Sequence, residues 1–241
     1  MNALAQQTVG RIVAENLHTA KIFESYNIDF CCQGNIELAE ACRSKGLDLE
    51  EVIRQINAAG RSQTRGQPDF FRLHLYDLTK YIVDVHHSYM YHLVPEIESH
   101  LQVASGTHAK SHPELKEALH TFAEFKDVFF RHMRMEEEEF FPYINALAQA
   151  NVGTAPMPPP MKMGLSEYIR FLEEDHRTAS GLITKIKSIC NNYVIPSDAC
   201  ITYRLFITQL QELEADTHVH INLEESVLHP RARELEQELK S

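Results

Sequence analysis

The pattern His-x3-Glu-x5-Pro occurs twice in this chain, and it restricts the possible folds more than any other feature. The first copy reads HMRMEEEEFFP over residues 132–142, and the second reads HINLEESVLHP over residues 220–230. In a helix of about 3.6 residues per turn, positions four apart lie one above the other, so each copy presents an imidazole and a carboxylate to the same point. Such a pair suits a metal ion, and its repetition predicts a two-metal site inside a helical bundle.

Four long helical patterns follow residue 69, and no strand pattern accompanies them. The expected helices cover residues 70–102, 114–148, 165–191 and 198–238. A proline-rich segment, 151–164, cannot be helical and connects the second helix to the third. We therefore expect an all-α protein built around an up-down four-helix bundle.

The residues before the bundle predict a second, smaller domain. Residues 1–59 show short helical patterns with turn signals at Gly10, Gly34 and Gly46. The segment 60–68 has no large apolar residue, carries two glycines and ends in proline, which is typical of a linker. The expected organisation is a small helical domain over 1–59, a linker over 60–68 and the bundle over 69–241.

The composition indicates which binding partners and which cellular compartment to expect. The 241 residues carry a formal net charge of -11, and we find no cluster of Lys and Arg, so neither nucleic acid nor an anionic membrane is expected as a partner. The N-terminal residues do not resemble a signal peptide, and no apolar run approaches the roughly 18 residues of a membrane span. The five cysteines include an adjacent pair, unlike a secreted disulfide framework. A cytoplasmic protein is expected.

Residues of metal-ligand type interrupt the apolar stripe of each expected helix. The third helix carries a single histidine in its stripe, His176, whereas His86 and His87 lie on two equally acceptable stripes of the first helix. The pattern alone does not choose between these two. Each half of the bundle thus has a lone histidine followed about 45 residues later by His-x3-Glu. This indicates an internal duplication that would bring four imidazoles and two carboxylates to one level.

Burial of the two repeated glutamates requires compensation. An isolated carboxylate in an apolar core costs on the order of several kcal/mol or becomes protonated, so Glu136 and Glu224 are expected to face cations. Nitrogen and carboxylate ligands shared between two ions in a bundle core suit iron or manganese better than structural zinc. Glu137 and Glu138, in contrast, are expected to be solvated. The remaining histidines have no repeated spacing and are expected at the surface or around the ligands; they include His74, His92, His100, His108, His112, His120, His218 and His229.

An adjacent cysteine pair, Cys31 and Cys32, lies in an expected turn between two short helices. Two ordinary packed residues are one interpretation of this pair. If a helix begins near Asn35, however, its N–H groups would lower the thiol pKa and make the pair redox-active or able to exchange metal. Both cysteines are therefore candidate catalytic residues, as a redox or iron relay.

The chain resembles the iron-sulfur cluster repair di-iron proteins, also called repair of iron centres proteins, of the YtfE and ScdA type. The segment Tyr26-x-Ile-Asp-Phe-Cys31-Cys32-x-Gly34 is similar to the signature of their N-terminal domain, and the duplicated bundle is similar to their hemerythrin-like domain. The resemblance covers nearly the whole chain. It implies a non-haem, carboxylate-bridged centre of two iron ions, and it selects the second histidine of the adjacent pair, as does counting eight residues back from Pro95. The implied ligands are His87, His132, Glu136, His176, His220 and Glu224, with both glutamates bridging.

Membership of this family would imply repair of iron-sulfur clusters, or supply of iron to them, after nitrosative or oxidative damage. Damaged iron-sulfur proteins would then be the partners, Cys31 and Cys32 a docking or relay element, and a homodimer is possible. The alternative is an enzyme, a di-iron nitric oxide or peroxide reductase. An oxygen or nitric oxide carrier or sensor is the weakest alternative, because only four histidines are placed.

Overall fold

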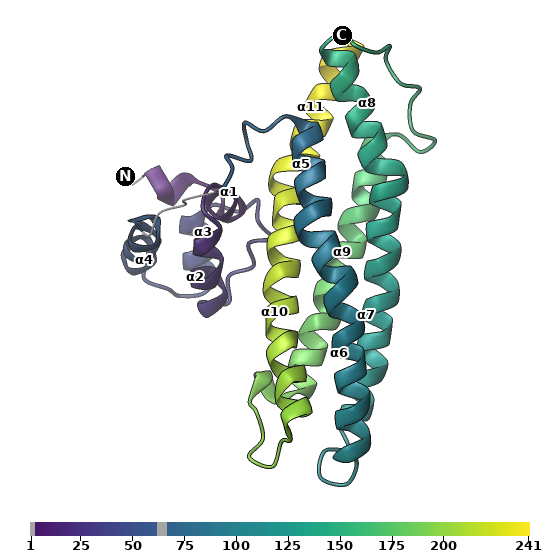
Figure 1. The fold of residues 1–241 in the computed structure, drawn as a ribbon. Coiled ribbons are helices and arrows are strands. Elements are labelled where there is room, and N and C mark those ends of the chain that lie inside the picture. Colours follow the sequence, from purple (N-terminus) through teal and green to yellow (C-terminus); the bar gives the residue numbers. More distant parts are fainter. Residues whose placement is uncertain (1–2, 62–66) are drawn as a thin grey trace. The chain divides into compact units, whose positions relative to one another are not determined.

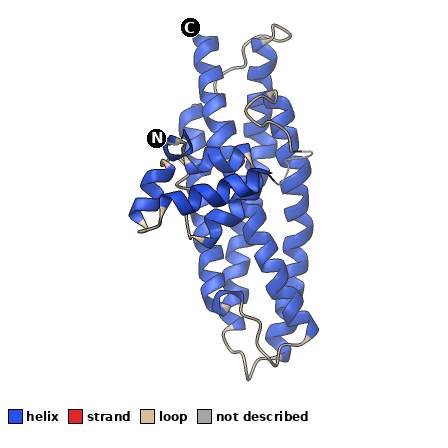
Figure 2. Cartoon of the chain, turned by 90° about the vertical axis from the view of Figure 1, so that its left-hand side faces the viewer, coloured by secondary structure: helices blue, strands red, loops and turns tan. Residues whose placement is uncertain are grey.

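Every regular element that the computed structural model describes, in residues 3–61 and 67–241, is helical (Figure 2). Within these ranges the only β pairing is an isolated bridge between Thr8 and Glu37. The predicted all-α class is confirmed. Most of the predicted linker, residues 62–66, lies outside the described residues.

The N-terminal part consists of short helices that pack around one apolar core. In chain order they are η1 (Ala3–Gln6), α1 (Val9–Glu15), η2 (Leu17–Thr19), α2 (Ala20–Ser25), α3 (Leu38–Ser44) and α4 (Leu49–Arg61). The side chain of Asp48 accepts a hydrogen bond from the backbone N–H of Glu50 at 3.0 Å, so it caps the start of α4. The core includes Val9, Phe23, Phe30 and Leu38. Ile221, which lies in a helix near the C-terminus, also belongs to this core.

Four long helical rods follow, as predicted, and they form an up-down bundle (Figure 1). The first contains α5 (Leu75–Tyr81), η3 (Ile82–His87) and α6 (Ser88–Thr107), and the second contains α7 (Leu115–Met135), η4 (Glu136–Phe140) and α8 (Phe141–Asn151). The third is α9 (Leu165–Ile189), followed by the 3-10 turn η5 (Asn191–Tyr193). The fourth contains α10 (Ile201–Leu223), η6 (Glu224–Leu228) and α11 (His229–Lys240).

Three of the four rods contain a π-helical turn, which the sequence pattern did not predict. The turn η3 ends at His87, whereas η4 begins at Glu136 and η6 begins at Glu224. A π turn adds one residue to the helix and so shifts the faces on either side of it, and such turns are frequent at functional sites. The matching positions of η4 and η6 extend the duplication from the sequence to the backbone.

Internal contacts divide the chain into two compact units, each made of several segments. The first unit comprises Met1–Thr79, Ile144–Pro160 and His218–Ser241, and the second comprises Lys80–Tyr143 and Met161–Thr217. The core of the second unit is a column of phenylalanines and aliphatic residues from all four rods; it includes Ile97, Phe122, Phe125, Phe129, Ile183, Phe206 and Leu210.

Of the three glycines expected in turns of the N-terminal part, only Gly10 has a different role. Gly46 has a φ of +64°, which confirms the predicted turn. Gly10 lies inside α1 instead of in a turn, and a Cβ atom added to it would lie 2.2 Å from Oγ of Ser226 and 3.0 Å from the carbonyl oxygen of Gly34. Glycine is therefore required at position 10 by close packing, because a larger side chain would meet both groups.

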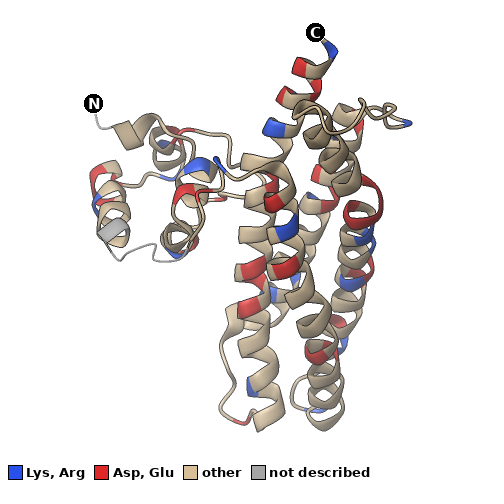
Figure 3. Cartoon of the chain, turned by 45° about the horizontal axis from the view of Figure 1, so that its top comes forward, with Lys and Arg blue, Asp and Glu red and all other residues tan. Residues whose placement is uncertain are grey.

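Acidic and basic residues are interspersed along the helices, as the colours of Figure 3 show. Several form exposed pairs one helical turn apart, such as Glu167 with Arg170 and Glu174 with Arg177. Such pairs contribute little to stability, roughly 0.3–0.5 kcal/mol each. Among the described helices, none is long and apolar enough to cross a membrane.

Candidate metal centre

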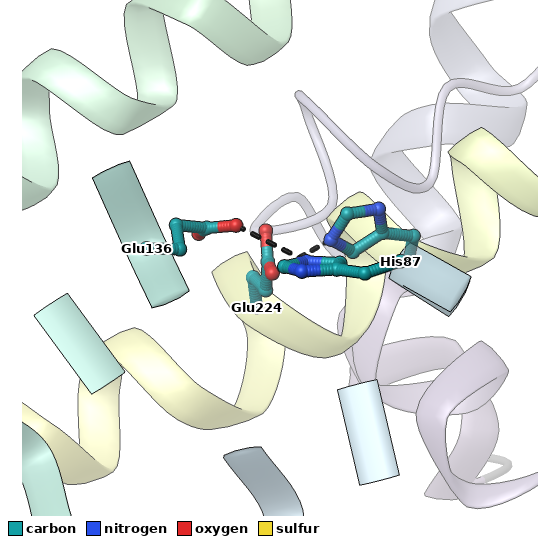
Figure 4. Close-up of side chains that lie close together, drawn as sticks. His87, Glu136 and Glu224 are labelled. Atoms are coloured by element: carbon teal, nitrogen blue, oxygen red, sulfur yellow. Dashed lines mark hydrogen bonds and ion pairs between the residues drawn. The ribbon is translucent and has the colours of Figure 1, made fainter. Parts of the chain in front are cut away.

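The second unit brings together four of the predicted ligands, three histidines and the buried carboxylate of Glu136. The side chains of His87, His132, Glu136 and His176 are fully buried. Oε2 of Glu136 lies 3.4 Å from Nε2 of His87 and 3.3 Å from Nε2 of His132. Nε2 of His132 lies 3.0 Å from Nε2 of His176. Figure 4 shows the carboxylate of Glu136 and the imidazole of His87 directed toward one another.

These separations fit the edges of a coordination polyhedron. Two ligand atoms about 2.1 Å from one ion lie about 3.0–3.4 Å apart, depending on whether the angle between them is octahedral or tetrahedral. The ligand atoms of His132, Glu136 and His176 all lie within 4.8 Å of one another. A buried carboxylate with imidazole nitrogens on two sides is a donor set for a cation, and the residues present fit a metal ion of the kind that nitrogen and oxygen ligands bind.

Glu137 orients His87, although the sequence analysis assigned it to a solvated acidic run. Nδ1 of His87 lies 2.7 Å from Oε1 of Glu137, whose side chain is only 31% exposed. An ionised carboxylate can only accept, so the proton lies on Nδ1 and the lone pair of Nε2 faces Glu136. Metal-binding histidines commonly donate their second N–H in this way. The signal available in the sequence was the position of Glu137 beside Glu136 on the same helix.

Phenylalanine rings stack on the imidazoles of His87 and His132 and restrict their orientation. The ring of His87 stacks on Phe141 with centroids 5.7 Å apart, and His132 stacks on Phe129 with centroids 5.9 Å apart. Phe129 in turn stacks on Phe125 at 5.2 Å. These contacts exclude water from the imidazoles, and in such a medium charges interact strongly.

Two neighbours of the ligand residues have partners of their own. Nδ1 of His86 lies 3.0 Å from Oδ1 of Asp216, so this histidine is held on another side of its helix from His87. Asp175, which precedes His176, is also buried and accepts a hydrogen bond from Arg131 at 2.8 Å. The interaction anchors α9 to α7 one residue before His176.

The first unit contains the remaining predicted ligands, His220 and Glu224. Both side chains are fully buried, and Nε2 of His220 lies 2.8 Å from Oε1 of Glu224. The histidine is in the last turn of α10 and the glutamate is the first residue of η6. This arrangement repeats that of His132 and Glu136 at the junction of α7 and η4.

The cysteine pair lies between α2 and α3, as expected, but its environment differs from the prediction. Helix α3 begins at Leu38 instead of near Asn35, so its N-terminus is not adjacent to the thiols. Oδ1 of Asp29 accepts from the backbone N–H groups of Cys31 and Cys32 at 3.1 and 3.0 Å, and from Sγ of Cys31 at 3.3 Å. The two sulfur atoms lie 3.8 Å apart as free thiols.

The pKa of Cys31 is raised well above its ordinary value, which contradicts the predicted lowering. The hydrogen bond with Cys32 is the largest cause, followed by burial and then by the negative charges of Cys32 and Asp29. Cys31 is buried, whereas Cys32 is partly accessible. Cys31 is therefore a protonated thiol at neutral pH.

Asn222 connects the turn that contains Cys31 and Cys32, called the cysteine turn below, to helix α10, which carries His220. Its side-chain amide nitrogen donates to the carbonyl oxygen of Phe30 at 2.9 Å and to that of Gly10 at 3.1 Å. Phe30 directly precedes Cys31, and Asn222 lies two residues before Glu224. The central residue of the second His-x3-Glu motif thus binds the backbone of the cysteine turn, a role that the sequence analysis missed.

The fold and the buried cluster of histidines and glutamates define a metal-binding four-helix bundle. Comparison with protein families agrees with this class. Residues 5–60 match the ScdA_N model, described as a domain of unknown function, and residues 78–232 match the hemerythrin HHE cation-binding domain. The chain belongs to the hemerythrin HHE cation-binding family, in the form that carries an ScdA_N domain before the bundle.

Relatives with the same arrangement cover almost the whole chain. The iron-sulfur cluster repair protein ScdA of Staphylococcus haemolyticus is 30% identical over 223 residues, which are 92% of this chain and 96% of the relative. The iron-sulfur cluster repair protein YtfE of Enterobacter sp. is 27% identical over 233 residues, 95% of this chain and 98% of the relative. A probable iron-sulfur cluster repair protein of Haemophilus influenzae is 25% identical over 230 residues, 95% and 97% of the two chains.

Proposed function

We propose that this protein repairs damaged iron-sulfur clusters, or supplies iron to them, from a carboxylate-bridged centre of two iron ions. The observation that carries the proposal is the fully buried Glu136 carboxylate, 3.3 and 3.4 Å from imidazole nitrogens of His132 and His87. The names of the relatives, iron-sulfur cluster repair proteins ScdA and YtfE, supply the activity.

The proposed centre combines the ligands of both halves of the duplicated bundle. Each half would provide two imidazoles and one carboxylate, and both glutamates would bridge. Two features support the combination: the copies share the His-x3-Glu spacing, and each glutamate begins a π turn. The proposed ligands are His87, His132, Glu136, His176, His220 and Glu224.

This donor set suits an iron store that can release its ion. Four imidazoles divided between two ions, with both carboxylates shared, would give each ion four protein ligands and leave positions open on a six-coordinate ion. Bound iron would supply the exchangeable ion. The protein holds the imidazoles in place through Glu137, Phe141 and Phe129, and the hydrogen bonds to Asn222 keep the cysteine turn on α10.

The clients proposed for this centre are iron-sulfur proteins damaged by nitric oxide or peroxide. The cysteine turn would contact the client or pass iron to it, because Cys32 is partly accessible while Cys31 and Asp29 lie behind it in hydrogen-bond contact. This role is separate from that of the buried ligands.

Metal content tests the centre itself. Glu136→Leu combined with Glu224→Leu removes both carboxylates, and we expect the purified variant to lose both iron ions. The matched control is Glu138→Gln, an exposed position in the same π turn as Glu136, which should keep two iron ions. Retention of two iron ions by the double variant would refute the centre.

Client reactivation tests the activity. A [4Fe–4S] dehydratase inactivated with nitric oxide is mixed with iron-loaded protein, and its recovered activity is compared with that given by an equal amount of free ferrous iron. We expect recovery with the native protein and none with the double glutamate variant. Cys31→Ala with Cys32→Ala should lower recovery while leaving the iron content unchanged. Equal recovery with free iron would contradict the repair function.

A further inference from the structure

A second cluster of ligand-type side chains lies in the second unit, outside the metal centre described above. It forms where the connection from α6 to α7 meets the connection from α9 to α10, at the lower end of the helices in Figure 1. Its members are His108 and His112 from the first connection and Asp198 from the second. Glu114, at the start of α7, lies beside them.

The backbone brings the two histidines onto one side of a helical turn. His108 is the C-terminal cap of α6, and the backbone N–H of His112 donates to the carbonyl oxygen of His108 at 2.8 Å. This bond between residues four apart continues the helical spacing past the end of α6. The two imidazole rings consequently lie with centroids 5.8 Å apart, and both contact the buried ring of Tyr203.

Hydrogen bonds fix the orientation of His112. Its Nδ1 lies 2.9 Å from Oε1 of Glu114, and its Nε2 lies 3.0 Å from Oδ1 of Asp198. With Nδ1 donating to Glu114, as Nδ1 of His87 does to Glu137, a bound ion would take the place of the proton between Nε2 and Asp198.

An ion pair between His112 and Asp198 does not explain the environment of His108. Its Nε2 atom is shielded from solvent and has no hydrogen-bond partner among the described residues. One ligand atom from each of His108, His112 and Asp198 lies within 4.8 Å of the others. A buried polar atom without a partner is uncommon in a folded protein, and an unlocated ion is one of the accepted explanations.

We infer that His108, His112 and Asp198 form a separate binding site for a divalent transition-metal ion, of which Zn²⁺ is the representative. Two imidazoles and one carboxylate are a common set of three protein ligands for Zn²⁺, with a fourth position left for water. Glu114 positions His112 from behind. The ion would join the two connections and so hold the ends of α6 and α10 together.

The test uses iron-loaded, full-length protein, so that the buried centre does not compete for the added ion. ZnCl₂ is titrated against a chromophoric chelator, and the unfolding temperature is followed at each concentration. We expect one Zn²⁺ per chain, together with a rise in unfolding temperature that depends on the Zn²⁺ concentration. His112→Gln and Asp198→Asn should each weaken Zn²⁺ binding by more than about tenfold with unchanged iron content.

The matched control is His120→Gln. His120 and Glu124 are an exposed imidazole–carboxylate pair one turn apart on α7, with Nε2 and Oε1 separated by 3.1 Å and with 77% of the histidine side chain exposed. Its replacement should leave Zn²⁺ binding unchanged. Asp198 is more than half exposed in a connection, so Asp198→Asn is expected to fold even if His112→Gln does not. Failure of the iron-loaded protein to bind Zn²⁺, or binding that Asp198→Asn leaves unchanged, would overturn the inference.

Discussion

Replacing Gly10 by alanine tests the contact between the N-terminal helices and the end of the chain. Alanine favours a helix over glycine by about 0.8–1.0 kcal/mol, so an uncrowded site in the middle of a helix should become more stable. At position 10, however, the added Cβ atom would lie 2.2 Å from Oγ of Ser226 and 3.0 Å from both the carbonyl oxygen of Gly34 and Nδ2 of Asn222. The Gly34 carbonyl belongs to the backbone and cannot rotate away.

The size of the effect follows from these contacts. Crowding of this kind costs about 1–3 kcal/mol. If Asn222 is displaced, a buried carbonyl loses its donor at a cost of about 1–3 kcal/mol for each group. After subtraction of the gain in helix propensity, we expect Gly10→Ala to reduce the free energy of unfolding by about 2–4 kcal/mol.

Hydrogen exchange of α1 and urea denaturation give the measurement, and Gly181→Ala is the control. Gly181 lies inside α9 with no atom within 4 Å of its added Cβ, so its replacement should stabilise the protein by about 0.5–1 kcal/mol. Adding Ser226→Gly to Gly10→Ala should restore only part of the loss, because the Gly34 carbonyl remains. The reasoning is refuted if Gly10→Ala and Gly181→Ala change stability in the same direction.

Two further predictions concern single groups. Glu137→Gln should weaken iron binding by about 10–100-fold, because the amide supports the Nδ1–H of His87 less well than a carboxylate; iron affinity from a chelator competition checks this, with Glu138→Gln as the unaffected neighbour. Burial, and to a lesser extent the charge of Glu114, raises the pKa of Cys190 to about 12 from an ordinary value of 9.0, so its thiol stays protonated in the folded protein at pH 9. Its contribution to stability should be intact below about pH 9 and be lost as the pH rises toward 12, and iodoacetamide labelling at pH 9 should require denaturation. Rapid labelling of Cys190 in the folded protein would contradict this pKa.

The repeated spacing of His132 with Glu136 and of His220 with Glu224 was sufficient to predict the fold class. Residues four apart lie one turn apart in a helix and can reach one ion, whereas in a strand they are about 13 Å apart. The apolar stripes around these pairs placed them in a core, and the structure buries all four side chains completely. Local pattern therefore determined which helices form and which faces they bury. The ends of the helices were less certain, as the start of the first rod at Leu75 instead of residue 70 illustrates.

Only the tertiary structure decided features that depend on residues distant in the sequence. The contact of Glu137 with His87 joins residues 50 positions apart, and that of Asn222 with Phe30 joins residues 192 positions apart. Neither leaves a periodic signal, because each depends on how two segments distant in the sequence meet. The π turns at Glu136 and Glu224 were likewise absent from the pattern, since one added residue changes the helix register without changing which residue types face the core. The sequence determined the helices and the ligand types, whereas packing determined which atoms orient those ligands.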